Sequence, residues 1–135
     1  MVATADLSQR LDIPGRAERC HLALTITRLL EQWGLDPADQ LMLLGLSNTG
    51  RSTLSRYRRG EPVSANRDMI ERIGHLLGIH KSLDTLFPEQ PEAQRVWISS
   101  RKKSLQRRTP VEYVEAEGIT GLRQLRSMAE AQMGW

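Results

Sequence analysis

The chain has 135 residues, of which 39% are hydrophobic and 26% charged, and its formal net charge is +3. This length allows one or two small domains with a modest core. The single cysteine, Cys20, excludes an intramolecular disulfide and argues against a secreted scaffold. No apolar run approaches the roughly 20 residues of a membrane span, and the N-terminal residues lack the apolar segment of a signal peptide. We therefore expect a cytoplasmic protein without a membrane anchor.

Residues 1–16 show no clear periodicity and are expected to form a loose N-terminal arm. From Leu22 to Trp33 the apolar residues are spaced for one face of a helix, which Gly34 ends. Asp36 and Pro37 then predict the start of a second helix, because Asp suits the N-cap and Pro loses no hydrogen bond at the first position.

The most informative stretch is Gly45 to Glu61, in which a polar turn leads into a short arginine-rich helix. At about 100° per residue, Leu54 and Tyr57 share one face of this helix and predict its buried side. The opposite face carries guanidinium and hydroxyl groups, which suit phosphates and base edges. This is the pattern of a recognition helix in a helix-turn-helix. The residues expected to contact DNA are Arg51, Ser52, Ser55, Arg56 and Arg59.

The next helix is expected to begin near Ser64 or Ala65 and to end at Gly78, followed by a fifth short helix around Leu83 to Phe87. Pro88 then marks a boundary. Five short helices thus account for the first two-thirds of the chain.

Beyond the boundary, Ala93, Val96 and Trp97 form a short apolar face. Thr109-Pro110-Val111-Glu112 predicts a strong helix start, with a hydroxyl cap, a proline at the first position and a glutamate that reaches back to the cap. Gly118 is expected to end that helix and Thr120 or Gly121 to open the last one. No strand pattern persists, so the predicted fold is all-α. The residues expected to face inward in the last helix are Leu122, Leu125, Met128 and Ala129.

Two segments leave alternatives open. The basic run Arg101 to Arg108 suits a solvated loop, contact with the DNA backbone, or contact with a partner protein. The terminal Trp135 either covers the last helix or belongs to a hydrophobic tail, Met133-Gly134-Trp135, offered to another protein's cavity.

No catalytic, cofactor or metal site is predicted. The histidines His21, His75 and His80 lack the helical spacing of zinc enzymes, and Cys20 has no companion cysteine. No phosphate-binding glycine loop is present either, because most glycines stand where helices are expected to end. We therefore do not expect an enzyme.

The order of features from about Ala17 to Trp135 resembles the Xre-type antitoxins with a MbcA/ParS-like C-terminal domain, which are partners of RES-domain toxins. In the N-terminal half the resemblance depends on the stretch Arg51 to Pro62, a pattern common to many repressors. The more specific C-terminal pattern consists of Ala93, Trp97, Thr109-Pro110-Val111-Glu112, Gly121 and Leu125. The sequence departs from the family in its basic run and in the inserted Asn48-Thr49-Gly50.

This resemblance implies an antitoxin that neutralises a co-encoded, NAD-consuming RES-type toxin by direct binding and represses the shared promoter. It implies a homodimer on operator DNA and an inhibitory role for Met133, Gly134 and Trp135. The corresponding organisation is an arm over 1–16, a helix-turn-helix domain over 17–88, and a toxin-binding domain over 89–135. Two rivals remain: a stand-alone helix-turn-helix repressor with a dimerising or sensing C-terminal domain, and an interaction module without DNA binding.

Overall fold

The computed structural model describes residues 13–133, and within that range the chain forms six α-helices, one 3-10 helix and no β-strand. The all-α prediction is therefore confirmed. None of these helices is long and apolar enough to cross a membrane. The elements in chain order are α2 (Arg16–Gln32), α3 (Pro37–Leu43), α4 (Arg51–Arg58), α5 (Arg67–Leu86), α6 (Pro91–Ser99), η1 (Lys103–Leu105) and α7 (Pro110–Gln132).

Local capping chemistry sets several helix ends. The Asp36 carboxylate accepts a hydrogen bond from the Asp39 amide (2.8 Å) and caps α3, as predicted. Asn66 caps α5 in the same way through the Met69 amide (2.8 Å), which places the start of that helix slightly later than expected. Thr109 and Glu112 form the predicted capping box at the start of α7.

The predicted helix end at Gly78 is wrong. α5 continues through this glycine to Leu86, so the expected fourth and fifth helices are one element. A glycine inside a helix costs about 1 kcal/mol, whereas complete burial of one large aliphatic side chain contributes about 1.5–3 kcal/mol. Ile79 and Leu83 are both fully buried beyond the glycine, so packing outweighs the local preference.

The expected break at Gly118 is present. Gly118 has φ 65° and ψ −146°, which interrupts α7 without an intervening loop. Pro110–Gln132 is consequently a single kinked element rather than two separate helices. Leu122, Leu125 and Ala129 are buried as predicted, while Met128 is partly buried.

α6 turns a different face to the core than the sequence suggested. Val96, expected in its apolar face, is 62% exposed, whereas Trp97 and Ile98 are buried. Gln94, one turn before these two residues, is buried with them and donates to Asp84 Oδ1 (2.9 Å) and to the Phe87 carbonyl (3.2 Å). These hydrogen bonds allow a polar residue to occupy the buried face in place of Val96.

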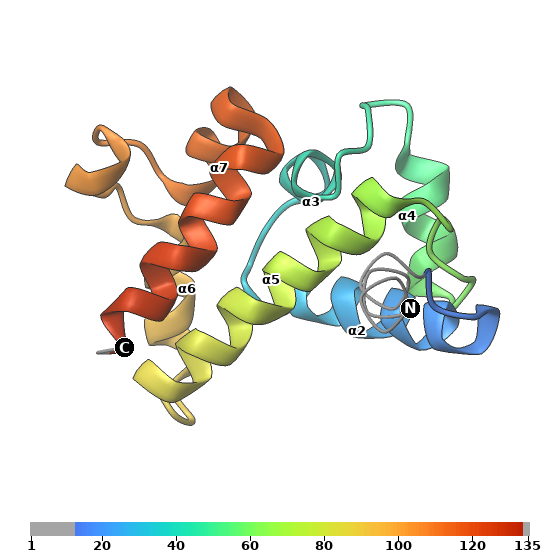
Figure 1. Cartoon of the computed structure of the whole chain (residues 1–135), viewed down its shortest axis with the longest axis horizontal. Coiled ribbons are helices and arrows are strands. Elements are labelled where there is room, and N and C mark those ends of the chain that lie inside the picture. The colour runs from blue at the N-terminus through green and yellow to red at the C-terminus, as the bar shows by residue number, and fades with distance from the viewer. Residues whose placement is uncertain (1–12, 134–135) are drawn as a thin grey trace, which may run out of the picture.

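α5 is the central element of the molecule. It packs against α7 on one side and α2 on the other, and α3 also touches α7. Figure 1 shows α5 crossing the middle of the molecule, with α7 on one side and α2 on the other. The helix-turn-helix part and the C-terminal helices therefore share one core. Fully buried members from both parts include Leu30, Ile73, Leu76, Leu83 and Leu122.

Candidate nucleic-acid interface

Helix α4 presents one apolar side to the core. Leu54 is 1% exposed and Tyr57 3%, so the predicted buried face is confirmed. The Tyr57 hydroxyl also accepts a hydrogen bond from the Ser64 amide (3.0 Å), which fixes the segment that follows the helix. That segment is held at a second point, where Arg19 Nη1 donates to the Val63 carbonyl (3.0 Å).

A polar network centred on Arg58 joins α4 to the two helices before it. Arg58 Nη2 lies 3.2 Å from Gln40 Oε1 on α3 and 3.2 Å from Glu31 Oε1 on α2. Gln40 is fully buried, and its Nε2 donates to the Leu35 carbonyl (2.8 Å). This one guanidinium therefore links α4 to both α3 and α2.

The structure brings the predicted DNA-contacting residues together on the outer side of α4. Arg51, Ser52, Arg56 and Arg59 are exposed, and Ser55 is half-buried. Arg51 and Arg56 form no ion pair within residues 13–133. Arg59 donates to Ser55 Oγ (3.2 Å) and to Glu61 Oε2 (3.1 Å). These contacts are exposed, so a phosphate can displace them at little cost.

The N-terminus of α4 adds a second attraction for phosphate. Gly50 is its N-cap and supplies no side-chain hydrogen bond, and the first helical bond runs from the Leu54 amide to the Gly50 carbonyl (3.0 Å). The amides of the first turn therefore point outward with the positive end of the helix dipole.

The inserted residues before α4 form a turn and do not lengthen the helix. The Gly50 amide donates to the Ser47 carbonyl (2.8 Å), and the Ser47 and Thr49 hydroxyls are 2.6 Å apart. The helix consequently begins at Arg51. Seven residues, 44–50, separate α3 from α4, which is longer than the three or four residues common in helix-turn-helix motifs.

Sequence reasoning missed the roles of Arg58 and Gln40. The spacing held a signal for Arg58, because it stands four residues after Leu54 and so shares the inner side of the helix. Nothing in the local sequence marks Gln40, whose partners are Leu35 and the distant Arg58.

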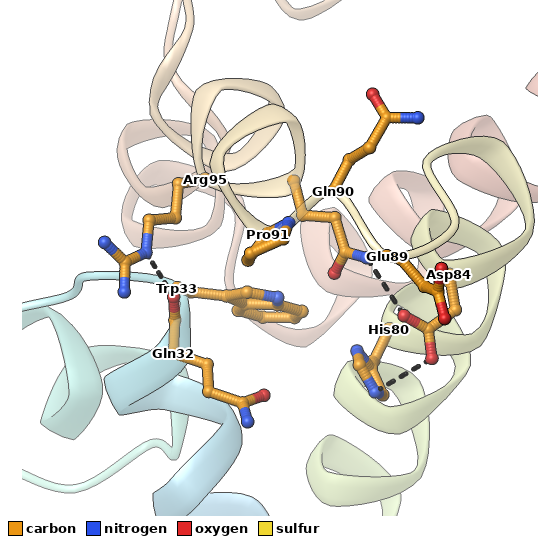
Figure 2. A pocket seen from close by; sticks show the side chains of 9 residues that line it. Gln32, Trp33, His80, Asp84, Glu89, Gln90, Pro91 and Arg95 are labelled. Atoms are coloured by element: carbon orange, nitrogen blue, oxygen red, sulfur yellow. Dashed lines mark hydrogen bonds and ion pairs between the residues drawn. The ribbon is translucent and has the colours of Figure 1, made fainter.

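A cavity of about 210 Å³ lies where α2, α5 and α6 meet. Figure 2 shows the Trp33 indole in this cavity, with Pro91 and Arg95 of α6 on one side and His80 and Asp84 of α5 on the other. Arg95 Nε donates to the Gln32 carbonyl (2.6 Å) and so ties α6 to the end of α2. Trp33 Nε1 and His80 Nδ1 are enclosed and have no hydrogen-bond partner among residues 13–133.

Charged groups link α5 to α7. Arg123 donates to Glu71 Oε2 (2.6 Å), and Arg126 Nη1 lies 3.3 Å from His75 Nδ1. Because a guanidinium only donates, Nδ1 accepts, and the proton on Nε2 is donated to Glu71 (3.1 Å). The hydrogen bond from Arg123 and, to a smaller extent, that from His75 lower the pKa of Glu71 to about 2, although partial burial opposes them.

Of the predicted tail, only Met133 lies within the described residues. It is the C-cap of α7 and is partly buried beside a groove that Lys81 and Thr85 of α5 also line. Gly134 and Trp135 lie outside the described residues.

Two comparisons with known proteins bear on this site. Residues 22–78 match the family model described as the antitoxin Xre-like helix-turn-helix domain. The uncharacterized protein y4oB of Sinorhizobium fredii is 29% identical over 108 residues, which cover 79% of this chain and 80% of that protein. The segment that matches the family model, residues 22–78, begins within α2 and ends within α5, so it includes the whole of α3 and α4. The chain is an all-α protein with an N-terminal helix-turn-helix domain similar to that of Xre-like antitoxins.

Proposed function

We propose that the protein is an antitoxin that neutralises a co-encoded RES-type toxin by direct binding and represses their shared promoter. The outer face of α4 supports the DNA-binding half of this proposal, because rigidly supported arginines and hydroxyls are combined there with a free helix N-terminus. The match of residues 22–78 to an antitoxin domain supports the same assignment.

In this proposal α4 enters the major groove. Arg51, Ser52, Ser55, Arg56 and Arg59 supply the contacts to phosphates and bases. One unit of this size reads only a few base pairs, so a homodimer on two operator half-sites is expected. Residues 17–88 act as the DNA-binding domain. Most of the expected arm, residues 1–12, lies outside the described residues, and α2 begins at Arg16, one residue before the expected boundary.

In this proposal residues 89–135 bind the toxin. The resemblance of the C-terminal pattern to RES-toxin partners supports this assignment, and the tail Met133-Gly134-Trp135 would obstruct the toxin's substrate entrance. A hydrophobic residue in a partner's cavity is an effective anchor, and tryptophan is among the best.

The DNA half is tested by fluorescence anisotropy with labelled promoter DNA at several salt concentrations. The double variant Arg56→Ala and Arg59→Ala should bind more weakly, and its log-affinity should fall less steeply with log salt, by about one unit for each phosphate that the variant no longer neutralises. Arg28→Ala, an exposed arginine of α2, is the control and should leave both quantities unchanged. Unchanged affinity of the double variant would exclude this face of α4 as the DNA-binding surface.

The toxin half is tested by growth. The neighbouring gene is induced alone, with the full chain, and with a chain that lacks Met133-Gly134-Trp135. Arrest that only the full chain relieves supports an antitoxin with an inhibitory tail. Relief by both chains would mean that the toxin binds to the helical part of the protein and not to the tail. A neighbouring gene without toxicity would mean that the protein is a repressor without a toxin partner.

A further inference from the structure

The segment 101–108, which we name the basic hairpin, carries an unbalanced positive charge. It contains Arg101, Lys102, Lys103, Arg107 and Arg108, and no Asp or Glu occurs between Glu92 and Glu112. Glu112 is already engaged, because it accepts hydrogen bonds from Arg101 (2.8 Å) and from the Thr109 amide (2.9 Å). Lys103, Arg107 and Arg108 form no ion pair with any residue from 13 to 133.

The basic hairpin has a defined conformation. The Lys102 amide donates to the Arg108 carbonyl (3.1 Å), and the Arg107 amide donates to the Lys102 carbonyl (2.9 Å). Leu105 anchors the turn in the core at 3% exposure. The Lys102 ammonium lies 4.1 Å from the centre of the Trp97 ring, a cation–π contact that holds the base of the hairpin.

Two successive residues of the turn adopt left-handed backbone conformations without being glycine. Gln106 has φ 60° and Arg107 φ 63°. Such conformations are unfavourable for residues with a Cβ and persist where the surrounding contacts enforce them. Here Arg101 Nη1 donates to the Arg107 carbonyl (3.1 Å) and provides one such contact. The backbone that carries these charges therefore has a defined turn conformation.

The position of the basic hairpin separates it from the DNA-facing helix. Figure 1 shows η1 and its flanking segments at one end of the longest axis and α4 at the other. The C-terminal end of α7 lies at the same end as η1. A DNA duplex bound to α4 would therefore lie at the end of the molecule away from the basic hairpin. A protein bound to the C-terminal end of α7 would lie close to the hairpin.

We propose that the basic hairpin docks onto an acidic surface of the toxin, through Lys103, Arg107 and Arg108. This inference rests on the proposed function for the identity of the partner. Guanidinium groups bind carboxylates in a bidentate manner, and charges at the edge of an interface mainly accelerate association and define the orientation of the partners. The hairpin thus orients the toxin on the C-terminal end of the molecule.

The test measures binding of the full-length protein to the purified product of the neighbouring gene by biolayer interferometry, at low and high salt. The variant Lys103→Glu with Arg107→Glu should weaken the complex by about tenfold or more at low salt, mostly through slower association, and the difference should shrink as salt rises. Its affinity for promoter DNA should stay unchanged. The matched control is Arg16→Glu with Arg28→Glu, which changes the charge equally on exposed positions of α2.

Each outcome decides the matter. If the hairpin variant and the control bind the toxin equally well, the inference is overturned and the antitoxin function stands. If the hairpin variant loses DNA binding instead of toxin binding, the hairpin is a DNA-binding element and the inference is overturned. If the unaltered protein does not bind the neighbouring product at all, the toxin partner and the inference both fail. Circular dichroism and thermal unfolding of both variants exclude loss of the fold as the cause.

Discussion

Arg58 of α4 donates from Nη2 to the amide oxygen of Gln40 on α3 across 3.2 Å, and Gln40 is fully buried. The same guanidinium lies 3.2 Å from Glu31 of α2. Arg58 is thus the arginine of α4 whose guanidinium reaches back to α2 and α3, although its side chain stays partly exposed.

Replacement of Gln40 should destabilise the protein. In Gln40→Ala the Leu35 carbonyl loses its donor, Arg58 loses an acceptor, and a cavity is left, which together cost about 2–4 kcal/mol. Urea unfolding measures the change in the free energy of unfolding. Gln32→Ala, on the exposed end of α2, is the control and should change it little. Equal effects of the two substitutions would contradict a structural role for the Arg58–Gln40 hydrogen bond.

The pairing of Glu71 with Arg123 predicts a dependence of stability on acid. The hydrogen bond from Arg123 lowers the pKa of Glu71 from 4.5 to about 2. Between these pH values the unfolded chain binds more protons than the native one, so stability rises with pH. The contribution of Glu71 is therefore complete above about pH 5 and is lost as the pH falls through 2.

Urea unfolding at pH 5.5 and at about pH 3 measures this contribution as a difference between proteins. Glu71→Gln should be less stable than the unaltered chain at the higher pH, and the gap should narrow in acid. Glu18→Gln removes a carboxylate that forms no ion pair within residues 13–133 and serves as the control. If the difference in unfolding free energy between Glu71→Gln and the unaltered chain stayed constant with pH, the pKa of Glu71 would be the same in the native and unfolded states.

The helix starts at Asp36 and Thr109 were predictable from the sequence, because capping depends on residues within one turn. The expected helix end at Gly78 is wrong because a glycine can either end a helix or lie inside one. Packing against residues distant in the sequence decides which of the two occurs. An added Cβ at Gly78 would lie within 3 Å of the Arg126 guanidinium of α7, so that flexible side chain would have to move.

The candidate site also has one part that the sequence predicts and one part that it does not. The outer face of α4 follows from helical spacing, and its residues lie together as that spacing requires. The network that orients α4 joins Arg58 to residues 18 and 27 positions earlier in the chain, Gln40 and Glu31. Side-chain partners this far apart cannot be identified from one sequence, because many other pairings of the same residue types are equally compatible with it.

Gly118 should not tolerate a side chain. Its φ of 65° and ψ of −146° belong to a region that other residues avoid, so Gly118→Ala should cost about 1–3 kcal/mol. Gly74 is the matched control, because it lies inside α5 with open space around its missing Cβ. Gly74→Ala should instead stabilise by about 0.5–1 kcal/mol. Thermal unfolding measures the change in stability of each variant, which should be a loss for Gly118→Ala and a gain for Gly74→Ala. Stabilisation by Gly118→Ala would contradict the kink in α7.

Two tryptophans differ in how their indole N–H groups are satisfied, and substitution by phenylalanine should distinguish them. Trp97 Nε1 donates to Gln132 Oε1 (2.9 Å), and its ring lies under the Lys102 ammonium. Trp33 Nε1 is enclosed without a partner among residues 13–133.

Phenylalanine removes the N–H in both cases and also reduces side-chain volume. At Trp97 it eliminates a hydrogen bond and weakens the cation–π interaction, so Trp97→Phe should cost about 1.5–3 kcal/mol. At Trp33 the loss of packing is offset by removal of a donor whose enclosure costs about 1–3 kcal/mol, so Trp33→Phe should change stability by less than about 1 kcal/mol. Urea unfolding of the two variants provides the comparison. An equal loss for both would mean that the Trp33 N–H is hydrogen-bonded in solution, which would place water in the cavity between α2, α5 and α6.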